Sequence, residues 1–322
     1  MTAPSSTTFQ RPDLGMAFRE FDSEAARAGF IGLEVLPTFD VTETSSQNFS
    51  IWDRESIMKL RNVMRAASGG YNRIDAEFNQ TSYTCKERGL EARVDDHQRN
   101  QFAYTGLQLE MAAVERVLYA VHLELENTIE AAIFNASTFT ANDVTNEWND
   151  DANGTPITDV RDAITSFKNQ CGMLPTHIVF SDSVFRNLWT NAQILARITG
   201  MGQSRDPSLV LKSALSELWG LEVLCPAGSS SSQDTADAGL AASISDIWDD
   251  EYAFLFRKSE GFRPGLGLTF NYVGDGATIN GGPSVEQYRE DKIRSDIFRT
   301  RTDYDPKIID TACGYLLGNI TS

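Results

Sequence analysis

The sequence has few residues of the kinds that hold metals or form structural cross-links. Its 322 residues include only four cysteines and three histidines, and no two cysteines form a C-x-x-C pair. These seven residues are Cys85, Cys171, Cys225, Cys313, His97, His122 and His177. Cysteines so far apart argue against a zinc motif and favour reduced thiols in a cytoplasm over disulfides. We therefore expect no metal and no cofactor.

Long apolar runs are also absent. No stretch approaches the roughly 18 uninterrupted apolar residues that a membrane span needs. Residues Met1–Gln10 carry neither the basic cluster nor the apolar core of a secretion signal. We therefore expect a soluble protein that is not secreted and has no membrane partner. A chain of this length buries about three quarters of its unfolded surface, so a stable core needs no cross-links.

Positive charge is scarce. The chain has 28 basic and 45 acidic side chains and a formal net charge of -17. This excess of acid argues against the phosphate contacts that supply most nucleic-acid affinity, so we expect no sequence-specific DNA binding. Residues 136–255 hold 6 basic and 16 acidic side chains, whereas residues 256–322 hold 9 of each. The middle of the chain is therefore expected to form a separate acidic unit.

Catalytic and ligand-binding motifs are missing too. There is no Gly-x-Ser-x-Gly elbow and no Cys/His dyad signature. The segment WNDDANG (148–154) matches the first half of a calcium loop in part, but Val160 occupies the position of the bidentate glutamate, so we interpret it as an Asx-rich turn. We interpret Asp95-Asp96-His97 as a solvated turn, and the glycine run 274–282 as a β-turn. We predict no catalytic residue and expect that the protein is not an enzyme.

The strongest local signal that is present is an apolar repeat between Leu107 and Phe134. No proline or glycine interrupts this segment, and apolar residues recur at spacings of three and four. They are Leu107, Met111, Val114, Leu118, Val121, Leu125, Ile129 and Ala132. The repeat predicts one amphipathic helix about 40 Å long, which would act as a strut.

Two extended segments, 36–51 and 83–94, precede this helix and predict a long hairpin. Between them a short helix is expected at 54–65 and a turn at 68–70. The whole excursion contains few large apolar groups, so we expect that it cannot form a core of its own. The apolar residues near its tip are the candidates for contact with another subunit: Trp52, Ile57, Met58, Leu60, Val63 and Met64.

Helices and strands alternate after residue 140 and predict a compact α/β unit. The expected helices are 159–170, 183–198 and 209–218, and the expected strands between them are 178–180 and 221–224. The segments expected to be β-like or apolar further along are 253–257, 266–273, 293–302 and 308–317. Serine and alanine dominate 226–242, which is expected to be a flexible loop. Residues 1–32 are expected to form an extended arm with a short helix near 23–28.

This order of elements resembles the major capsid proteins of tailed double-stranded-DNA bacteriophages of the Hong Kong 97 type. The string GLQLEMAAVERVLYAVHLELENTIEAAIF (106–134) is similar to the spine helix of that family, and YTCKERGLEARVDD (83–96) resembles the returning strand of its E-loop. GMLPTHIVFSDSVFRNL (172–188) resembles a strand and helix of the A-domain, and residues 284–317 resemble the closing P-domain strands. The resemblance covers nearly the whole chain and depends on the order of elements.

The resemblance implies an α+β capsid fold with the following parts: an N-terminal arm at 1–35, an E-loop hairpin at 36–96, the first part of a P-domain with its spine helix at 97–140, an α/β A-domain at 141–257, and closing P-domain strands at 258–322. It implies a shell subunit that assembles with its own copies into hexamers and pentamers of an icosahedral virion head. Assembly would take place in the cytoplasm of a host bacterium, and the head would enclose DNA. Portal, scaffolding and decoration proteins are the further partners of such a shell; since the sequence begins directly with the arm, a separate scaffolding protein, or none, is expected.

Two other interpretations remain open. An encapsulin-like compartment shares this fold, and a cytoplasmic α/β enzyme with an unrecognised site is a different class of protein. A hairpin of about sixty residues and an N-terminal arm without a cargo-facing helix favour the phage shell over the compartment. The coreless hairpin weighs against the enzyme, because an independent monomer gains nothing from an exposed arm of this size.

Overall fold

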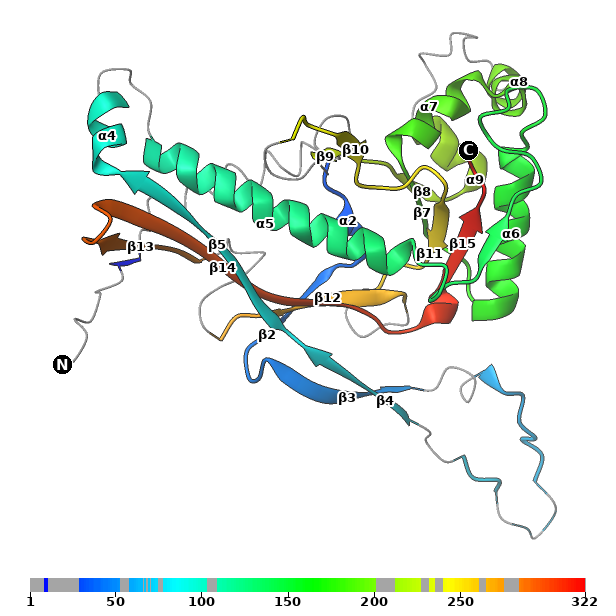
Figure 1. Ribbon diagram of the computed structural model, residues 1–322. Coiled ribbons are helices and arrows are strands. Elements are labelled where there is room, and N and C mark those ends of the chain that lie inside the picture. The colour runs from blue at the N-terminus through cyan, green and yellow to red at the C-terminus, as the bar shows by residue number, and fades with distance from the viewer. Residues whose placement is uncertain are drawn as a thin grey trace.

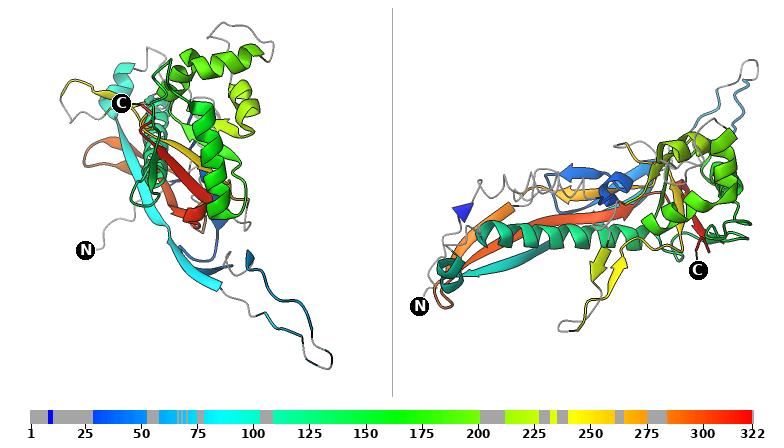
Figure 2. Two further views of the ribbon diagram at one scale, coloured as in Figure 1. Left: turned by 90° about the vertical axis from the view of Figure 1, so that its right-hand side faces the viewer. Right: turned by 90° about the horizontal axis from the view of Figure 1, so that it is seen from above.

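The computed structural model describes residues 9–10, 29–52, 58–65, 67, 69, 71–74, 78–102, 109–200, 212–226, 232–234, 240–260, 265–274 and 284–321. These residues form an elongated body with a long helix running along it (Figure 1). A two-stranded hairpin projects from the body, and the helical end of the molecule lies opposite the end that carries the β13 label (Figures 1 and 2).

The long helix is α5, Leu109–Ile133, which confirms the predicted strut over the residues that the structure describes. One face of α5 is buried along its length. Its buried residues are Val114, Val117, Leu118, Val121, His122, Leu125, Glu126, Ile129 and Ile133. The helix lies against β5 (Lys86–Asp95) and β14 (Ser295–Ile308), so it joins the middle of the sequence to its end.

The sheet beneath α5 is organised by β14, a strand of 14 residues. One edge of β14 pairs with β5, and the other edge pairs with two strands in succession, β13 (Ser284–Glu290) and β12 (Gly267–Tyr272). Two short strands complete the sheet, β1 (Phe9–Gln10) beside β13 and β2 (Thr38–Val41) beside β12. The predicted segments 266–273 and 293–302 are thus confirmed as strands, and pairing on both edges extends the second of them to Ile308.

A second sheet forms the centre of the α/β unit. Its strand order is β6 (Ala141–Asp143), β15 (Gly314–Gly318), β11 (Ala253–Phe256), β7 (His177–Phe180) and β8 (Glu222–Leu224). Every residue of β7 and β11 is buried, which fits sequences that are apolar except for His177. The helices packed on this sheet are α6 (Pro156–Cys171), α7 (Asp182–Thr190), α8 (Ala192–Gly200) and α9 (Lys212–Trp219).

Side chains of β11 point alternately to the two faces of this sheet and connect two cores. Ala253 and Leu255 face the core shared with the helices α6 to α9. Phe254 and Phe256 face a second core, which also contains the end of α5. The α/β unit is therefore buried on both sides, and its second core attaches it to the strut helix.

The helix expected at 183–198 is divided in the structure. α7 ends at Thr190, because Asn191 adopts an extended backbone conformation. The Asn191 side-chain oxygen then accepts a hydrogen bond from the backbone N–H of Gln193 at 3.0 Å and begins α8. By contrast, α6 ends within one residue of the expected position 170, because Gly172 adopts the left-handed conformation with φ 75° and caps the helix.

Several expectations for the hairpin need correction. The extended segment 83–94 is two strands, because β4 (Phe78–Thr84) pairs with β3 (Ser46–Trp52) whereas β5 pairs with β14. The change of partner occurs at Cys85. Residues 59–65 are not helical, so the helix expected at 54–65 is wrong there, and residues 53–57 lie outside the described residues.

Four short elements complete the description. α2 (Gly32–Val35) and α4 (Asp96–Phe102) were not expected from the sequence. The short helix expected near 23–28 lies outside the described residues. In the segment expected to be a flexible loop, β9 (Ser232–Asp234) pairs with β10 (Ile244–Asp246), which begins just beyond it.

Candidate assembly surface

The tip of the hairpin exposes the apolar residues that the sequence singled out. Leu60 is 98% exposed, Val63 88% and Met64 81%. The side chains of Trp52 and Ile57, the other two candidates apart from Met58, lie outside the described residues. Scattered exposed leucines are common, but here several nearly bare apolar side chains lie on one projection, which makes it a candidate binding surface.

Met58 differs from its neighbours because it lies against the body of its own chain. A β-carbon at Gly172 would come within 2.3 Å of the Met58 methyl carbon, so the methionine covers this glycine at the end of α6. Met58 nevertheless remains 55% exposed. At Met58 the hairpin therefore touches the α/β unit. The side chains of Leu60, Val63 and Met64, further along the hairpin, remain exposed.

The returning limb of the hairpin adds apolar residues that the sequence analysis missed. Tyr71 is 75% exposed, Ile74 68% and Phe78 50%. Their signal in the sequence was available, since they are large apolar residues in an otherwise polar segment of the same excursion. We define the hairpin tip by the residues Met58, Leu60, Val63, Met64, Tyr71, Ile74 and Phe78.

Polar contacts shape the hairpin tip although its apolar groups are bare. The Arg65 side chain donates to the carbonyl oxygen of Gly69 at 2.6 Å and lies over the Tyr71 ring, 5.0 Å from its centre. The Asn72 amide donates to the carbonyl oxygen of Asn62 at 2.8 Å and so links the two limbs. These contacts present the apolar side chains on a defined backbone.

The base of the hairpin, in contrast to its tip, packs within its own subunit. Tyr83 stacks on Phe270 with ring centres 4.5 Å apart, and Phe49 lies 5.3 Å from the same ring. Cys85 and Leu268 complete this small buried cluster. The expectation that the hairpin forms no core of its own is therefore confirmed, because its base is buried against β12, which supplies apolar partners from a distant part of the sequence.

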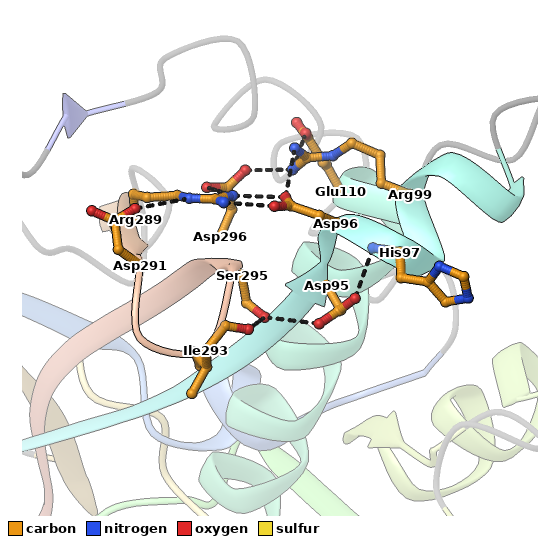
Figure 3. A network of polar contacts seen from close by, with 10 residues as sticks. All are labelled: Asp95, Asp96, His97, Arg99, Glu110, Arg289, Asp291, Ile293, Ser295 and Asp296. Carbon is orange, nitrogen blue, oxygen red and sulfur yellow. Dashed lines mark hydrogen bonds and ion pairs between the residues drawn. The ribbon is translucent and has the colours of Figure 1, made fainter.

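The opposite end of the body carries a network of ion pairs (Figure 3). The Arg289 guanidinium holds both oxygens of Asp96, at 2.7 and 2.6 Å, and also reaches Asp296 at 3.3 Å. Arg99 binds Asp296 at 2.5 Å and Glu110 at 3.0 Å. The hydrogen bond from Arg289 lowers the pKa of the Asp96 carboxyl. The network thus links α4, α5 and both strands of the β13–β14 hairpin.

This network corrects the interpretation of Asp95-Asp96-His97 as a plain solvated turn. Asp96 is paired with arginine, and Asp95 accepts the backbone N–H of His97 at 2.7 Å. The His97 ring points away from the carboxylates (Figure 3), so the three residues do not form an acid–base arrangement. Their role in this structure is to tie strand β5 to the start of α4.

The segment WNDDANG forms the Asx-rich turn that the sequence predicts. One Asp150 oxygen accepts the backbone N–H groups of Ala152 and Asn153 at 3.0 and 3.1 Å. Among the described residues, no group of three or more histidine, cysteine or acidic side chains is arranged to hold a metal ion. Nor does any described helix combine the length and the apolar character that crossing a bilayer requires.

A buried carboxylate holds the start of α2 against the strut helix. Glu126 of α5 is 3% exposed and accepts the backbone N–H groups of Ile31 and Gly32 at 2.9 and 2.8 Å. It also accepts the Trp248 indole N–H at 2.7 Å. Burial raises the pKa of Glu126, whereas the three donated hydrogen bonds oppose that rise. Three separate segments of the chain therefore meet at one side chain.

Comparison with known proteins identifies the fold. No protein-family model matches the sequence, and no curated protein matches it. Solved structures do match over nearly the whole chain. A phage-related protein from Bordetella bronchiseptica RB50 is 19% identical, with 98% of each chain covered and a TM-score of 0.70.

Two further structures are of assembled particles. The virus-like particle from Pyrococcus furiosus is 10% identical, covers 95% of this chain and 98% of its own, and has a TM-score of 0.56. The mature capsid of bacteriophage PhiM1 is 12% identical, with 87% and 84% covered and a TM-score of 0.53. The chain thus has the fold of phage-type shell subunits. The predicted α+β fold of the Hong Kong 97 type is confirmed.

Proposed function

We propose that the chain is the major capsid protein of a tailed double-stranded-DNA bacteriophage, a subunit that assembles with its own copies into the hexamers and pentamers of an icosahedral head. The observation that carries this proposal is the apolar hairpin tip, projecting from a body with the capsid fold. Full burial of a large apolar side chain contributes about 1.5 to 3 kcal/mol. Most of that gain is unrealised at Leu60, Val63 and Met64 in a single subunit. A second copy of the chain is the partner that would realise it.

The same proposal assigns a role to each part of the chain. We assign residues 36–96 to the E-loop, 97–140 and 258–322 to the P-domain, 141–257 to the A-domain and 1–35 to the N-terminal arm. Trp52, Ile57, Met58, Leu60, Val63 and Met64 would contact a neighbouring subunit. The acidic A-domain would repel packaged DNA, which needs no sequence-specific contact. The subunit would act in the virion without catalytic activity, after assembly in the cytoplasm of its host bacterium, together with a portal and with scaffolding or decoration proteins.

The test is a chain in which residues 54–79 are replaced by a short glycine-containing turn. We expect soluble subunits with near-native circular dichroism that no longer form closed shells in negative-stain micrographs. A matched control replaces exposed Arg73 of the same segment with serine, and it should assemble like the parent. Normal shells from the shortened chain would refute the proposed role of the hairpin.

An encapsulin-like compartment is the second candidate, supported by the likeness to a virus-like particle that is not named as a phage. The two candidates predict different contents. Particles purified from an infected or induced host should contain nuclease-protected DNA if the chain is a phage capsid protein. Particles that contain an enzyme and no genome would support the compartment instead.

A further inference from the structure

Two buried cysteines meet at the end of α6, although they are far apart in the sequence. The sulfur atoms of Cys171 and Cys313 lie 3.2 Å apart across a sequence separation of 142 positions. Cys171 is 1% exposed and Cys313 is fully buried. The sulfur atoms of a disulfide are about 2.05 Å apart, so an approach of roughly 1.2 Å would bring these two to bonding distance.

The environment of the pair holds both sulfur atoms in place. Phe167 packs against the two cysteines, and Met173 and Tyr315 cover the cluster from its edge. Cys313 follows Asp310, whose carboxylate accepts the N–H of Ala312 at 3.0 Å and begins the short 3-10 helix η3 (Thr311–Cys313). Both cysteines therefore stand at the ends of helices whose positions are fixed by backbone hydrogen bonds.

The burial of the pair is shallow in spite of these low exposures. The residues on either side of Cys171, Gln170 and Gly172, are exposed, and so is Thr311, the first residue of η3. Fraying of the last turn of α6 is enough to open a path to the sulfur atoms. Contact with Cys171, together with burial, raises the pKa of the Cys313 thiol, so this thiol stays protonated and reacts slowly while the helix end is closed.

We propose that Cys171 and Cys313 form an oxidative cross-link site, which closes to an intrachain disulfide when the protein meets a thiol-specific two-electron oxidant. Each thiol loses one hydrogen as the S–S bond forms. With a diazene oxidant such as diamide, the two protons and two electrons pass to the N=N bond, which becomes a hydrazine. The proposal does not depend on the function of the protein, because it concerns one subunit and its own two thiols.

The cross-link would fasten the α/β unit at one corner. It would tie the end of α6 to the turn that leads into β15, the strand that lies between β6 and β11 in the second sheet. A disulfide that closes so long a loop restricts the unfolded chain strongly and so stabilises the folded chain. The cysteine pattern predicts reduced thiols, as is usual for proteins in a cytoplasm. The reduced pair agrees with that prediction, and the disulfide would form only outside the cytoplasm.

The experiment uses the full-length protein, reduced, desalted and incubated with diamide in urea well below its unfolding transition, so that the end of α6 can open. Thiols are then counted after denaturation. We expect the four thiols of the chain to fall to two. Peptide mapping without reduction should find Cys171 linked to Cys313, and the thermal midpoint should rise by several degrees.

Two variants make the outcome decisive. Cys313→Ser should keep its three remaining thiols and show no rise in thermal midpoint, whereas Cys85→Ser should still form the linked peptide. Consumption of added glutathione in a parallel tube shows that the oxidant is active. Four thiols after prolonged incubation, a link that involves Cys85 or Cys225, or a link between two chains would overturn the proposal.

Discussion

The α/β unit buries its apolar side chains, whereas the hairpin leaves those at its tip largely exposed. All residues of β7 and β11 are buried between two cores of the same subunit. The hairpin is buried only at its base, and beyond β3 and β4 it leaves Leu60 almost fully exposed. The α/β unit thus contains the contacts that stabilise it, whereas the hairpin tip leaves most of its apolar surface exposed. We therefore expect substitutions in the α/β unit to lower the stability of the subunit, and substitutions in the hairpin tip to weaken association between subunits.

The largest loss of subunit stability is expected from the core of the α/β unit. Phe180 is fully buried and packs edge-on against Trp219 with ring centres 6.2 Å apart. Phe180→Ala removes these contacts and leaves a cavity, so the free energy of unfolding should fall by about 3 to 5 kcal/mol. Urea unfolding followed by tryptophan fluorescence measures the change. In the comparison variant Phe78→Ala on the hairpin, the free energy of unfolding should fall far less. An equal fall in both variants would contradict the contrast between the two regions.

A smaller loss of subunit stability is expected from a substitution of Glu126, the residue that holds the start of α2. Glu126→Gln replaces one of two acceptor oxygens with an amide that cannot accept the hydrogen bonds of Ile31 and Gly32 together. Leaving one buried donor unpaired costs about 1 to 3 kcal/mol. Hydrogen exchange at Ile31 and Gly32 should rise in the glutamine variant, and unchanged exchange there would show that Glu126 does not hold this segment.

The neighbouring Glu130 should make stability depend on pH. Burial, followed by the charge of Asp249, raises its pKa from 4.5 to about 7. The unfolded chain then ionises at lower pH than the folded one, so the associated stability is present below pH 4.5 and is lost as pH rises through about 7. Glu130→Gln should flatten this decline. Urea midpoints of the two proteins should agree near pH 4.5 and diverge by pH 8, with the variant the more stable; parallel curves would contradict the assignment.

The smallest effect on the subunit is expected at the hairpin tip, where the effect on association is greatest. The double substitution Leu60→Ser with Val63→Ser alters side chains that contact little within the subunit, so the free energy of unfolding should change by less than about 0.5 kcal/mol. Shell formation, measured by light scattering and electron microscopy, should nevertheless be lost. Arg73→Ser supplies the polar comparison on the same segment. A double variant that assembles normally would remove the distinction drawn between hairpin and body.

How far the sequence predicted the structure depended on whether the signal was local. The strut helix was predicted because apolar spacing along α5 reports its buried face directly. The change of partner at Cys85 was not, because no turn residue marks it and the partner β14 lies about 200 positions away. β13 has no apolar pattern in its sequence SVEQYRE, so only the resemblance of residues 284–317 to closing strands predicted it, and pairing with β14 makes it a strand.

The candidate surface shows the same limit. Met58, Leu60, Val63 and Met64 stood out as apolar groups in a polar excursion, and their contact with a second subunit stays a prediction. The ion pair between Arg289 and Asp96 spans 193 positions and could not be read from either segment alone. Local sequence patterns identified the exposed apolar groups, but they could not predict which charged residues from distant segments form ion pairs.

The position of β14 has a consequence for the order of events during synthesis. This strand supplies the pairing partner of β5, β12 and β13, yet about nine tenths of the chain precedes it. Pairings between such distant segments form late and slowly. During translation the long sheet stays unassembled until residues 295–308 leave the ribosome, so a nascent chain lacks the body on which its hairpin is mounted. If the chain assembles as proposed, an unfinished copy would lack the body that carries the hairpin tip, so β14 would have to be complete before the copy could enter a particle.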